Sequence, residues 1–169
     1  MEHPKAIFLL NRVQEITHYT FRDRGLAWEA LQVAGSGVTF VDGRTIIKGN
    51  QRLAIVGNSA LSSALVGDWF FGGRSKGEWD RARQNLLSND NLANIGRYTG
   101  LDQCLNVHPM NPVRASPGLV ADLVEAVFGT VFCDSGKSLD AAKELMDRLG
   151  LTVGLALVTF TTPSPFYET

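Results

Sequence analysis

Two carboxylates, Asp122 and Glu125, stand three residues apart inside the otherwise apolar segment "ADLVEAVFGTVF". Residues three or four positions apart share one face of an α-helix, so these side chains are expected to project side by side. Neighbouring acids repel, and they are costly to bury unless a cation or a basic partner satisfies them. Two interpretations stay open here. The pair is structural and favoured by the positive N-terminal end of its helix, or it is half of a divalent-metal site, since magnesium prefers oxygen ligands.

A second pair of positions with helical spacing, Ala54 and Asn58, lies in "GNQRLAIVGNSAL". If both were acidic, four carboxylates from two antiparallel helices could converge on one metal ion. Alanine offers no ligand, and asparagine offers a neutral and weaker one. The predicted metal ligands are therefore Asp122, Glu125 and Asn58, and the predicted magnesium binding is weak or absent.

A cluster of cations in "GGRSKGEWDRARQN" could contact phosphate groups of a nucleic acid, each contact adding salt-sensitive affinity. The same segment also carries Glu78 and Asp80, which favours a solvated helix face as the other interpretation. The candidate RNA-binding residues are Arg74, Lys76, Arg81 and Arg83.

Composition narrows the class of protein. The 169 residues suit one domain, and a net charge of −1 excludes an acidic tail or a strongly basic nucleic-acid binder. Two cysteines are too few for a disulfide framework or a zinc site. The N-terminus does not look like a secretory signal, and no apolar run approaches the roughly 20 residues of a membrane span. We expect a soluble intracellular protein with no membrane partner; cytoplasm, nucleus and mitochondrion are not distinguished.

The elements that position these residues are predicted to be mainly helices. Residues 102–115 are expected to be a loop, and Asp42-Gly43 predicts a type I′ turn in a β-hairpin over 38–48. We expect one all-α domain over 1–150 and a C-terminal tail over 151–169. The predicted helices span 4–16, 23–33, 50–71, 75–88, 89–100, 116–133 and 138–150. Ser116-Pro117 and Ser138 are expected to begin the last two of these helices, and Gly100 to end the helix over 89–100.

Four segments resemble the ribonuclease III domain family. "GNQRLAIVGNSAL" looks like the family's N-E-R-L-E-F-L-G-D-x-x-L segment, and "SPGLVADLVEAVFGTVFCDSG" resembles its xxxxxADxxEAxxGAxYxDxG segment. "ITHYTFRDRGLAWEALQ" and "LLSNDNLANIGRYTGLDQCL" are similar to two further family segments, and all four occur in family order over about residues 16–150. The sequence of residues 49–57 resembles small single-domain fungal members of the family in particular. The end of the chain at residue 169 fits the same expectation. No separate double-stranded-RNA-binding domain is expected.

This resemblance implies a helical endonuclease domain that dimerises and uses four acids to place magnesium against double-stranded RNA. Carried over to this chain, one acidic pair is retained as Asp122 and Glu125. The other pair falls on Ala54 and Asn58, and the motif's leading glutamate is Gln51. The resemblance therefore implies a degenerate nuclease site.

Three hypotheses of function follow. The first is a non-catalytic protein that binds double-stranded RNA in RNA processing, as a homodimer or as a heterodimer with an intact paralogue. The second is a slow magnesium-dependent endoribonuclease, and the third is reuse of the cleft for a small-molecule reaction. The dimer interface is predicted on the helix over 50–71, whose apolar stripe ends at Trp69, Phe70 and Phe71.

Overall fold

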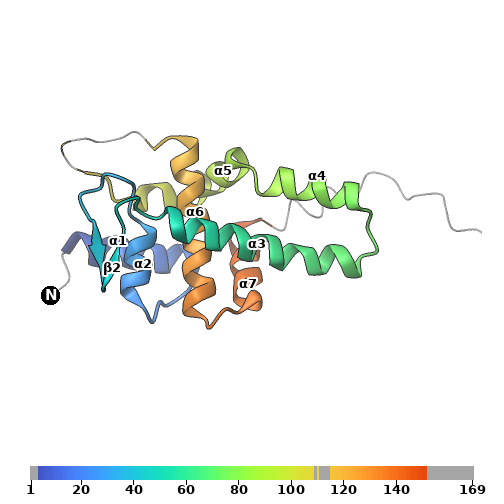
Figure 1. Cartoon of the computed structure of the whole chain (residues 1–169), viewed down its shortest axis with the longest axis horizontal. Coiled ribbons are helices and arrows are strands. Elements are labelled where there is room, and N and C mark those ends of the chain that lie inside the picture. Colours follow the sequence, from blue (N-terminus) through green and yellow to red (C-terminus); the bar gives the residue numbers. More distant parts are fainter. Residues whose placement is uncertain (1–3, 109, 111–114, 152–169) are drawn as a thin grey trace, which may run out of the picture.

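The computed structural model describes residues 4–108, 110 and 115–151. It confirms a mostly helical protein with one small antiparallel hairpin (Figure 1). The predicted tail lies outside the described residues, apart from the buried Leu151. The elements are α1 (Pro4–Thr17), α2 (Arg24–Ala30), β1 (Phe40–Val41), β2 (Arg44–Thr45), α3 (Gln51–Phe71), α4 (Lys76–Leu86), α5 (Asn89–Thr99), the 3-10 helix η1 (Leu101–Cys104), α6 (Pro117–Asp134) and α7 (Leu139–Leu149).

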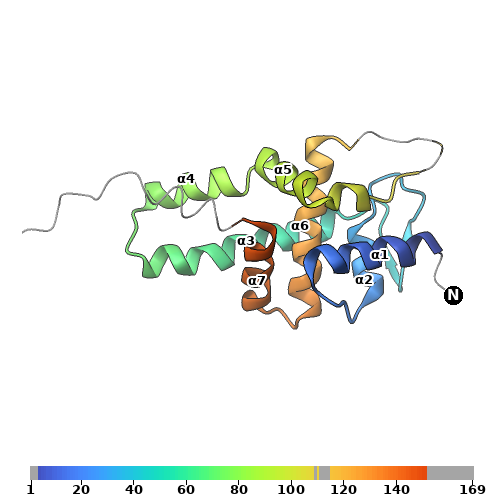
Figure 2. The same ribbon diagram turned by 180° about the vertical axis from the view of Figure 1, so that it is seen from behind.

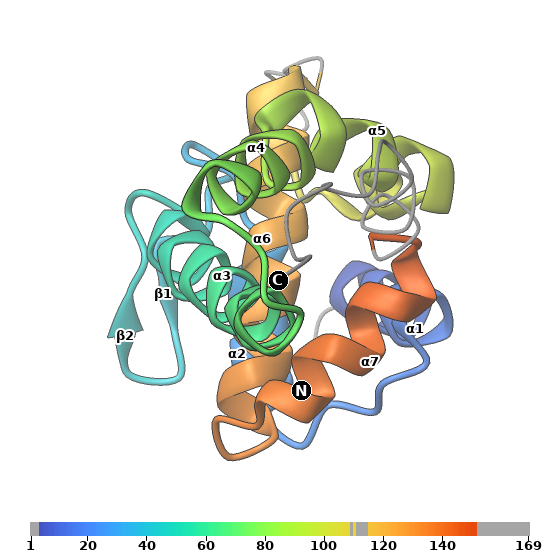
Figure 3. The same cartoon turned by 90° about the vertical axis from the view of Figure 1, so that its right-hand side faces the viewer.

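Helix α6 forms the centre of the fold, between α3 on one side and α7 on the other (Figure 3). Its side chains from Val120 to Val131 are buried almost without interruption, except for Asp122. A helix that is apolar on all sides is expected in a core position. The Ser116 side chain caps its first turn and Pro117 occupies the first helical position, as the sequence predicted.

Two glycines let α3 and α6 cross at close range. A Cβ atom on Gly57 would overlap the carbonyl of Glu125, and one on Gly129 would overlap the carbonyl of Leu53. Glycine inside a helix costs roughly 1 kcal/mol relative to alanine, so its use at both positions is explained by this contact. The crossing places the N-terminal half of α3 directly against the acidic turn of α6.

The apolar stripe of α3 is used inside this chain. Leu53, Ala60, Leu61, Ala64 and Leu65 are all buried in the core of the protein itself. This buried part of the stripe therefore belongs to the core, and the predicted interface rests on the exposed apolar side chains of α3, such as Ile55, Phe70 and Phe71. The exposed apolar side chains of α3 lie on its other faces.

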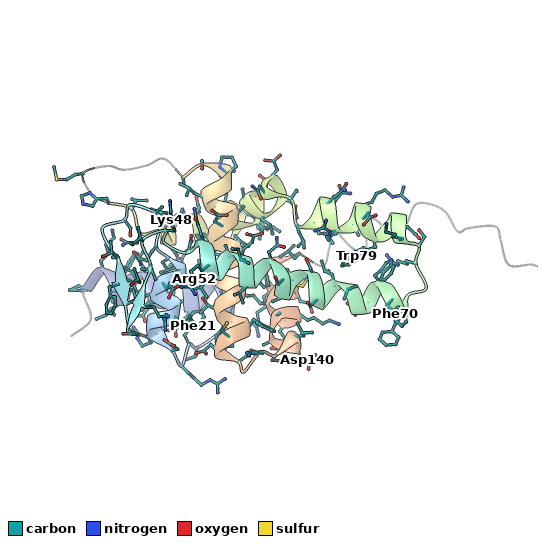
Figure 4. The ribbon with its side chains drawn as sticks, in the orientation of Figure 1. Phe21, Lys48, Arg52, Phe70, Trp79 and Asp140 are labelled. Atoms are coloured by element: carbon teal, nitrogen blue, oxygen red, sulfur yellow. The ribbon has the colours of Figure 1, made fainter. Side chains whose placement is uncertain are left out.

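The C-terminal half of α3 and α4 form an arm that extends away from the body (Figures 1 and 2). Trp69 packs against Trp79 of α4 with ring centroids 5.7 Å apart and donates its indole N–H to the Ser75 carbonyl. Phe70 and Phe71 are exposed at the far end of the arm, where Figure 4 labels Phe70. The two rings contact each other edge to face.

Two sequence predictions are corrected by the structure. Helix α2 ends at Ala30 instead of continuing to residue 33, because the backbone of Gln32 bonds across to Asn50 and the backbone of Val33 to Asn106. The expected loop over 102–115 begins with a turn of 3-10 helix. Leu101 and Cys104 are both fully buried, and a 3-10 turn brings side chains three residues apart onto one side.

The hairpin forms where Asp42-Gly43 predicted it. Both turn residues have positive φ, as a type I′ turn requires, and Phe40 pairs with Thr45. A 2.8 Å ion pair between Arg44 and the buried Glu29 fastens the hairpin to α2. Among the described helices, none has the length and apolar character needed to cross a membrane.

Candidate functional site

The four positions singled out in the sequence meet in one hollow between α3 and α6. Ala54 and Asn58 come from α3, and Asp122 and Glu125 come from α6. The hollow has a volume of about 480 Å³ and opens to solvent, with its rim formed by Gln51, Ile55 and Ser59. Helical spacing predicted each pair, and the glycine-mediated crossing brings the pairs together.

Asn58 and Glu125 are joined directly. The Asn58 amide Nδ2 donates a hydrogen bond of 2.6 Å to the Glu125 carboxylate oxygen Oε1. The Glu125 residue is only 8% exposed, so an unsatisfied carboxylate here would be costly. The amide therefore takes the place that a cation would otherwise fill for this carboxylate.

The surroundings of Asp122 and Glu125 disfavour the ionised form of both carboxyl groups. Burial raises the pKa of the Glu125 carboxyl; the Asn58 hydrogen bond lowers it by a smaller amount, and the neighbouring Asp122 raises it again. Burial also raises the pKa of Asp122. Both acids are thus harder to ionise than free carboxyls.

Ala54 contributes only a methyl group to the hollow. It is 3% exposed and packs in a small cluster with Ala30, Leu53 and Ala126. Its Cβ lines the space into which a longer side chain at this position would project. The site therefore has one face with two carboxylates and an opposite face with an amide and a methyl group.

The donor set does not fit a four-carboxylate magnesium site. The two carboxylates expected on α3 are absent, and the Asn58 group that faces Glu125 is a donor, whereas a metal needs an acceptor oxygen. In the described part of the chain, no group of three or more His, Cys, Asp or Glu side chains is placed to hold a metal ion. The ligands that remain for a metal ion are Asp122, Glu125 and the oxygen of an Asn58 amide turned toward the ion.

The four cations proposed for RNA binding lie on the arm. Lys76, Arg81 and Arg83 are exposed on α4, and Arg74 is half-buried just before it. Since an α-helix rises about 1.5 Å per residue, the arm's tip at Phe71 lies roughly 20 Å along α3 from Asn58. The structure does not bring these cations into the hollow between α3 and α6.

Sequence reasoning missed two other cations. Lys48 and Arg52 line a second hollow of about 280 Å³ at the start of α3, and this hollow shares Gln51 and Ile55 with the acidic one. Figure 4 labels both at the end of α3 opposite the arm. Lys48 and Arg52 lie four residues apart on either side of the predicted helix start, and this spacing could have indicated that they lie close together.

Comparison with known proteins found relatives that cover most of this chain. The family model described as the ribonuclease III domain matches residues 51–136, about half of the chain. A protein named Ribonuclease 3 from Rhodopirellula baltica is 32% identical over 151 residues, which are 86% of this chain and 52% of the relative. Another Ribonuclease 3, from Psychromonas ingrahamii, is 31% identical over 142 residues, which are 81% of this chain and 58% of the relative. The chain spans about half the length of these curated relatives.

Two solved structures share the fold. Both are of the nuclease domain of ribonuclease III from Campylobacter jejuni, at 20% sequence identity. One has a TM-score of 0.71 and covers 87% of this chain and 99% of that chain, and its description concerns flexibility in a region involved in its dimer formation. The other has a TM-score of 0.67 and covers 91% of this chain and 97% of that chain.

Proposed function

The chain belongs to the ribonuclease III domain family, and on that premise we propose that it binds double-stranded RNA without appreciable cleavage. In this role it is a pseudonuclease that takes part in RNA processing through binding alone. The fold of a nuclease domain supports the binding half of the proposal. The chemistry of the hollow between α3 and α6 supports the loss of cleavage.

One observation carries the proposal: Asn58 donates a hydrogen bond to Glu125, while Ala54 brings only a methyl group to the same hollow. Metal-assisted hydrolysis needs ligands that hold the ion against the phosphate and activate a water molecule. Here the α3 half of the ligand set is replaced by an amide that bonds to Glu125 and by a methyl group, and neither supplies a carboxylate.

The expected loss of rate is large. Removing one well-placed electrostatic contributor from an active site costs a factor of roughly 10²–10³ in turnover. Two such positions are altered, and both lie on the same helix. We therefore expect little turnover under conditions in which an intact four-acid site would be active.

A slow magnesium-dependent endoribonuclease is the second candidate. It is favoured by the placement of Asp122 and Glu125 side by side, where both residues line the hollow. Magnesium tolerates a shell made mostly of water, so two carboxylates are a minimal attachment point. The resemblance to small single-domain fungal members of the family stays a prediction.

The proposed assembly is a homodimer, or a heterodimer with an intact paralogue. Support comes from exposed apolar side chains that the core does not use. Ile47 and Ile55 flank the hollows at the start of α3, and Ile55 is 70% exposed. Phe70 and Phe71 are exposed at the tip of the arm, and Phe71 is 87% exposed. Exposed apolar groups of this size favour a protein partner.

The proposal is tested with the wild-type chain and a labelled RNA duplex. In EDTA, a gel shift should show a complex with the duplex. With Mg²⁺ or Mn²⁺ added, the duplex should stay intact over hours. If cleavage occurs and the double variant Asp122→Ala, Glu125→Ala abolishes it, the second candidate replaces the first. If no complex forms in either buffer, the RNA-binding proposal is wrong.

A further inference from the structure

A metal-free acidic hollow presents an electrostatic problem for RNA. Asp122 and Glu125 bring two carboxyl groups to one face of the site, and only the neutral Asn58 amide faces them from α3. Without a bound cation, an RNA strand that crosses this hollow places phosphates against like charge. Binding of RNA at this place therefore needs positive side chains close by.

Lys48 and Arg52 are placed to supply that charge. Both line the hollow of about 280 Å³ at the start of α3, which adjoins the acidic hollow through Gln51 and Ile55. Six residues separate Arg52 from Asn58, or roughly 9 Å along the helix axis. Phosphates along one strand of a duplex are spaced at about 3.4 Å of helix axis, so a short run of one strand reaches from one hollow to the other.

The charged groups of Lys48 and Arg52 are available to a ligand. Both side chains are exposed, and among the described residues neither forms an ion pair or a side-chain hydrogen bond. Arg44, which is only a few residues away, differs in this respect because it is bound to the buried Glu29 at 2.8 Å. The N-terminal end of the 21-residue α3 adds a favourable field for an anion, because its Asn50 cap makes no side-chain hydrogen bond to the first turn.

We infer that Lys48 and Arg52 form a phosphate-binding site that holds one RNA strand across the metal-depleted hollow between α3 and α6. This inference rests on the proposed RNA-binding function and adds the residues that carry it. The arm cations are a separate surface, distant along α3 from the hollow. Charge from Lys48 and Arg52 takes over part of the role that a metal ion plays where four acids are present.

The test is the salt dependence of duplex binding. The variant is Lys48→Gln, Arg52→Gln, and the matched control is Lys137→Gln, Arg148→Gln, which removes two exposed cations from the α6–α7 loop and α7. The slope of log affinity against log salt is negative, and each lost phosphate contact makes it less steep by about 0.9. For two contacts, the affinity lost between 50 and 200 mM salt should be smaller by about 12-fold in the variant than in wild type. The control should keep the wild-type slope.

The outcomes separate this inference from the proposed function. If wild type does not bind the duplex, both fail. If wild type binds and the variant keeps the wild-type slope, the Lys48–Arg52 site is wrong while RNA binding stands. An equal change in variant and control would mean that net charge alone is sensed, and the site is again wrong. Light scattering on each protein completes the test: a variant that loses binding only because its oligomeric state changes would assign these cations to an interface and overturn the inference.

Discussion

Restoring the missing acids should make the stability of the protein depend on metal. The perturbation is the double variant Ala54→Glu, Asn58→Asp. The backbone should accept it, since glutamate is a good helix former and the Ala54 side chain borders a hollow of about 480 Å³ that can receive a longer group. In chelator, the variant should unfold at a lower temperature than wild type.

The size of this loss follows from the contact that is removed. The Asn58–Glu125 hydrogen bond of 2.6 Å has a charged acceptor, and such bonds contribute about 1.5–3 kcal/mol. Replacing the amide by a carboxylate also places like charges together, although proton uptake by the pair limits that repulsion. A loss of about 3 kcal/mol is expected, which corresponds to a decrease of roughly 6–12 °C in Tm for a domain of this size.

Metal should return most of this stability. A ligand that binds only the folded state at 100 times its Kd stabilises that state by about 2.7 kcal/mol. Melting by differential scanning calorimetry, in EDTA and then in Mg²⁺, measures both quantities. The matched control is Ser63→Glu, Gly67→Asp, which adds two acids four residues apart on α3 outside the hollow. If the restored variant gains no more from Mg²⁺ than this control, then positions 54 and 58 do not converge with Asp122 and Glu125, and the account of the site is refuted.

Three further predictions concern the helix crossing, the acidic pair and assembly. Gly57→Ala should cost about 1–3 kcal/mol or more in thermal unfolding, because its Cβ would overlap the Glu125 carbonyl, whereas Gly67→Ala, with open space around it, should be neutral or stabilising; equal effects would contradict the close crossing. Because burial raises the pKa of Asp122 in the folded state, its charge is destabilising at neutral pH and this penalty fades as the pH falls through that raised pKa. Asp122→Asn should therefore raise Tm modestly at pH 7, with a gain that shrinks toward pH 4, and a constant or growing gain would rule this out. Light scattering at micromolar concentration should give about twice the 18.4 kDa chain mass, and Ile55→Asp should lower it; a monomeric wild type would exclude the proposed dimer.

Local signals in the sequence were sufficient for most of the elements. Ser116-Pro117 and Ser138 each cap the helix that they predicted, and Gly100 ends α5 in the left-handed conformation. Asp42-Gly43 forms the predicted turn of the hairpin. These signals act over a few neighbouring residues, so they can be interpreted without knowledge of the tertiary structure.

The failures are at places where distant segments decide the conformation. Helix α2 stops early because Gln32 bonds with Asn50 and Asn106, which are far from it in sequence. Much of the α3 stripe is covered by α6 within the chain, so the sequence could not show which of its apolar residues are left for an interface. Neither partner can be assigned from the local pattern of apolar residues.

The sequence predicted only part of the candidate site. Spacing predicted that Asp122 and Glu125 share a face and that position 54 lies one turn from position 58. The direct bond from Asn58 to Glu125 depends on the crossing of α3 and α6, for which Gly57 and Gly129 were an unused signal. Isolated glycines inside two apolar helices indicate close backbone approach.

The central claim is that the α3 half of the hollow lacks the ligands for cleavage while the rest of the nuclease frame is intact. The most direct measurement is the single-turnover rate at which a labelled RNA duplex is cut in Mg²⁺ by wild type and by the variant Ala54→Glu, Asn58→Asp, side by side. The account predicts an intact duplex with wild type and cleavage with the variant that is lost again when Asp122→Ala is added. Equal cleavage by wild type and variant, abolished in both by Asp122→Ala, would contradict it.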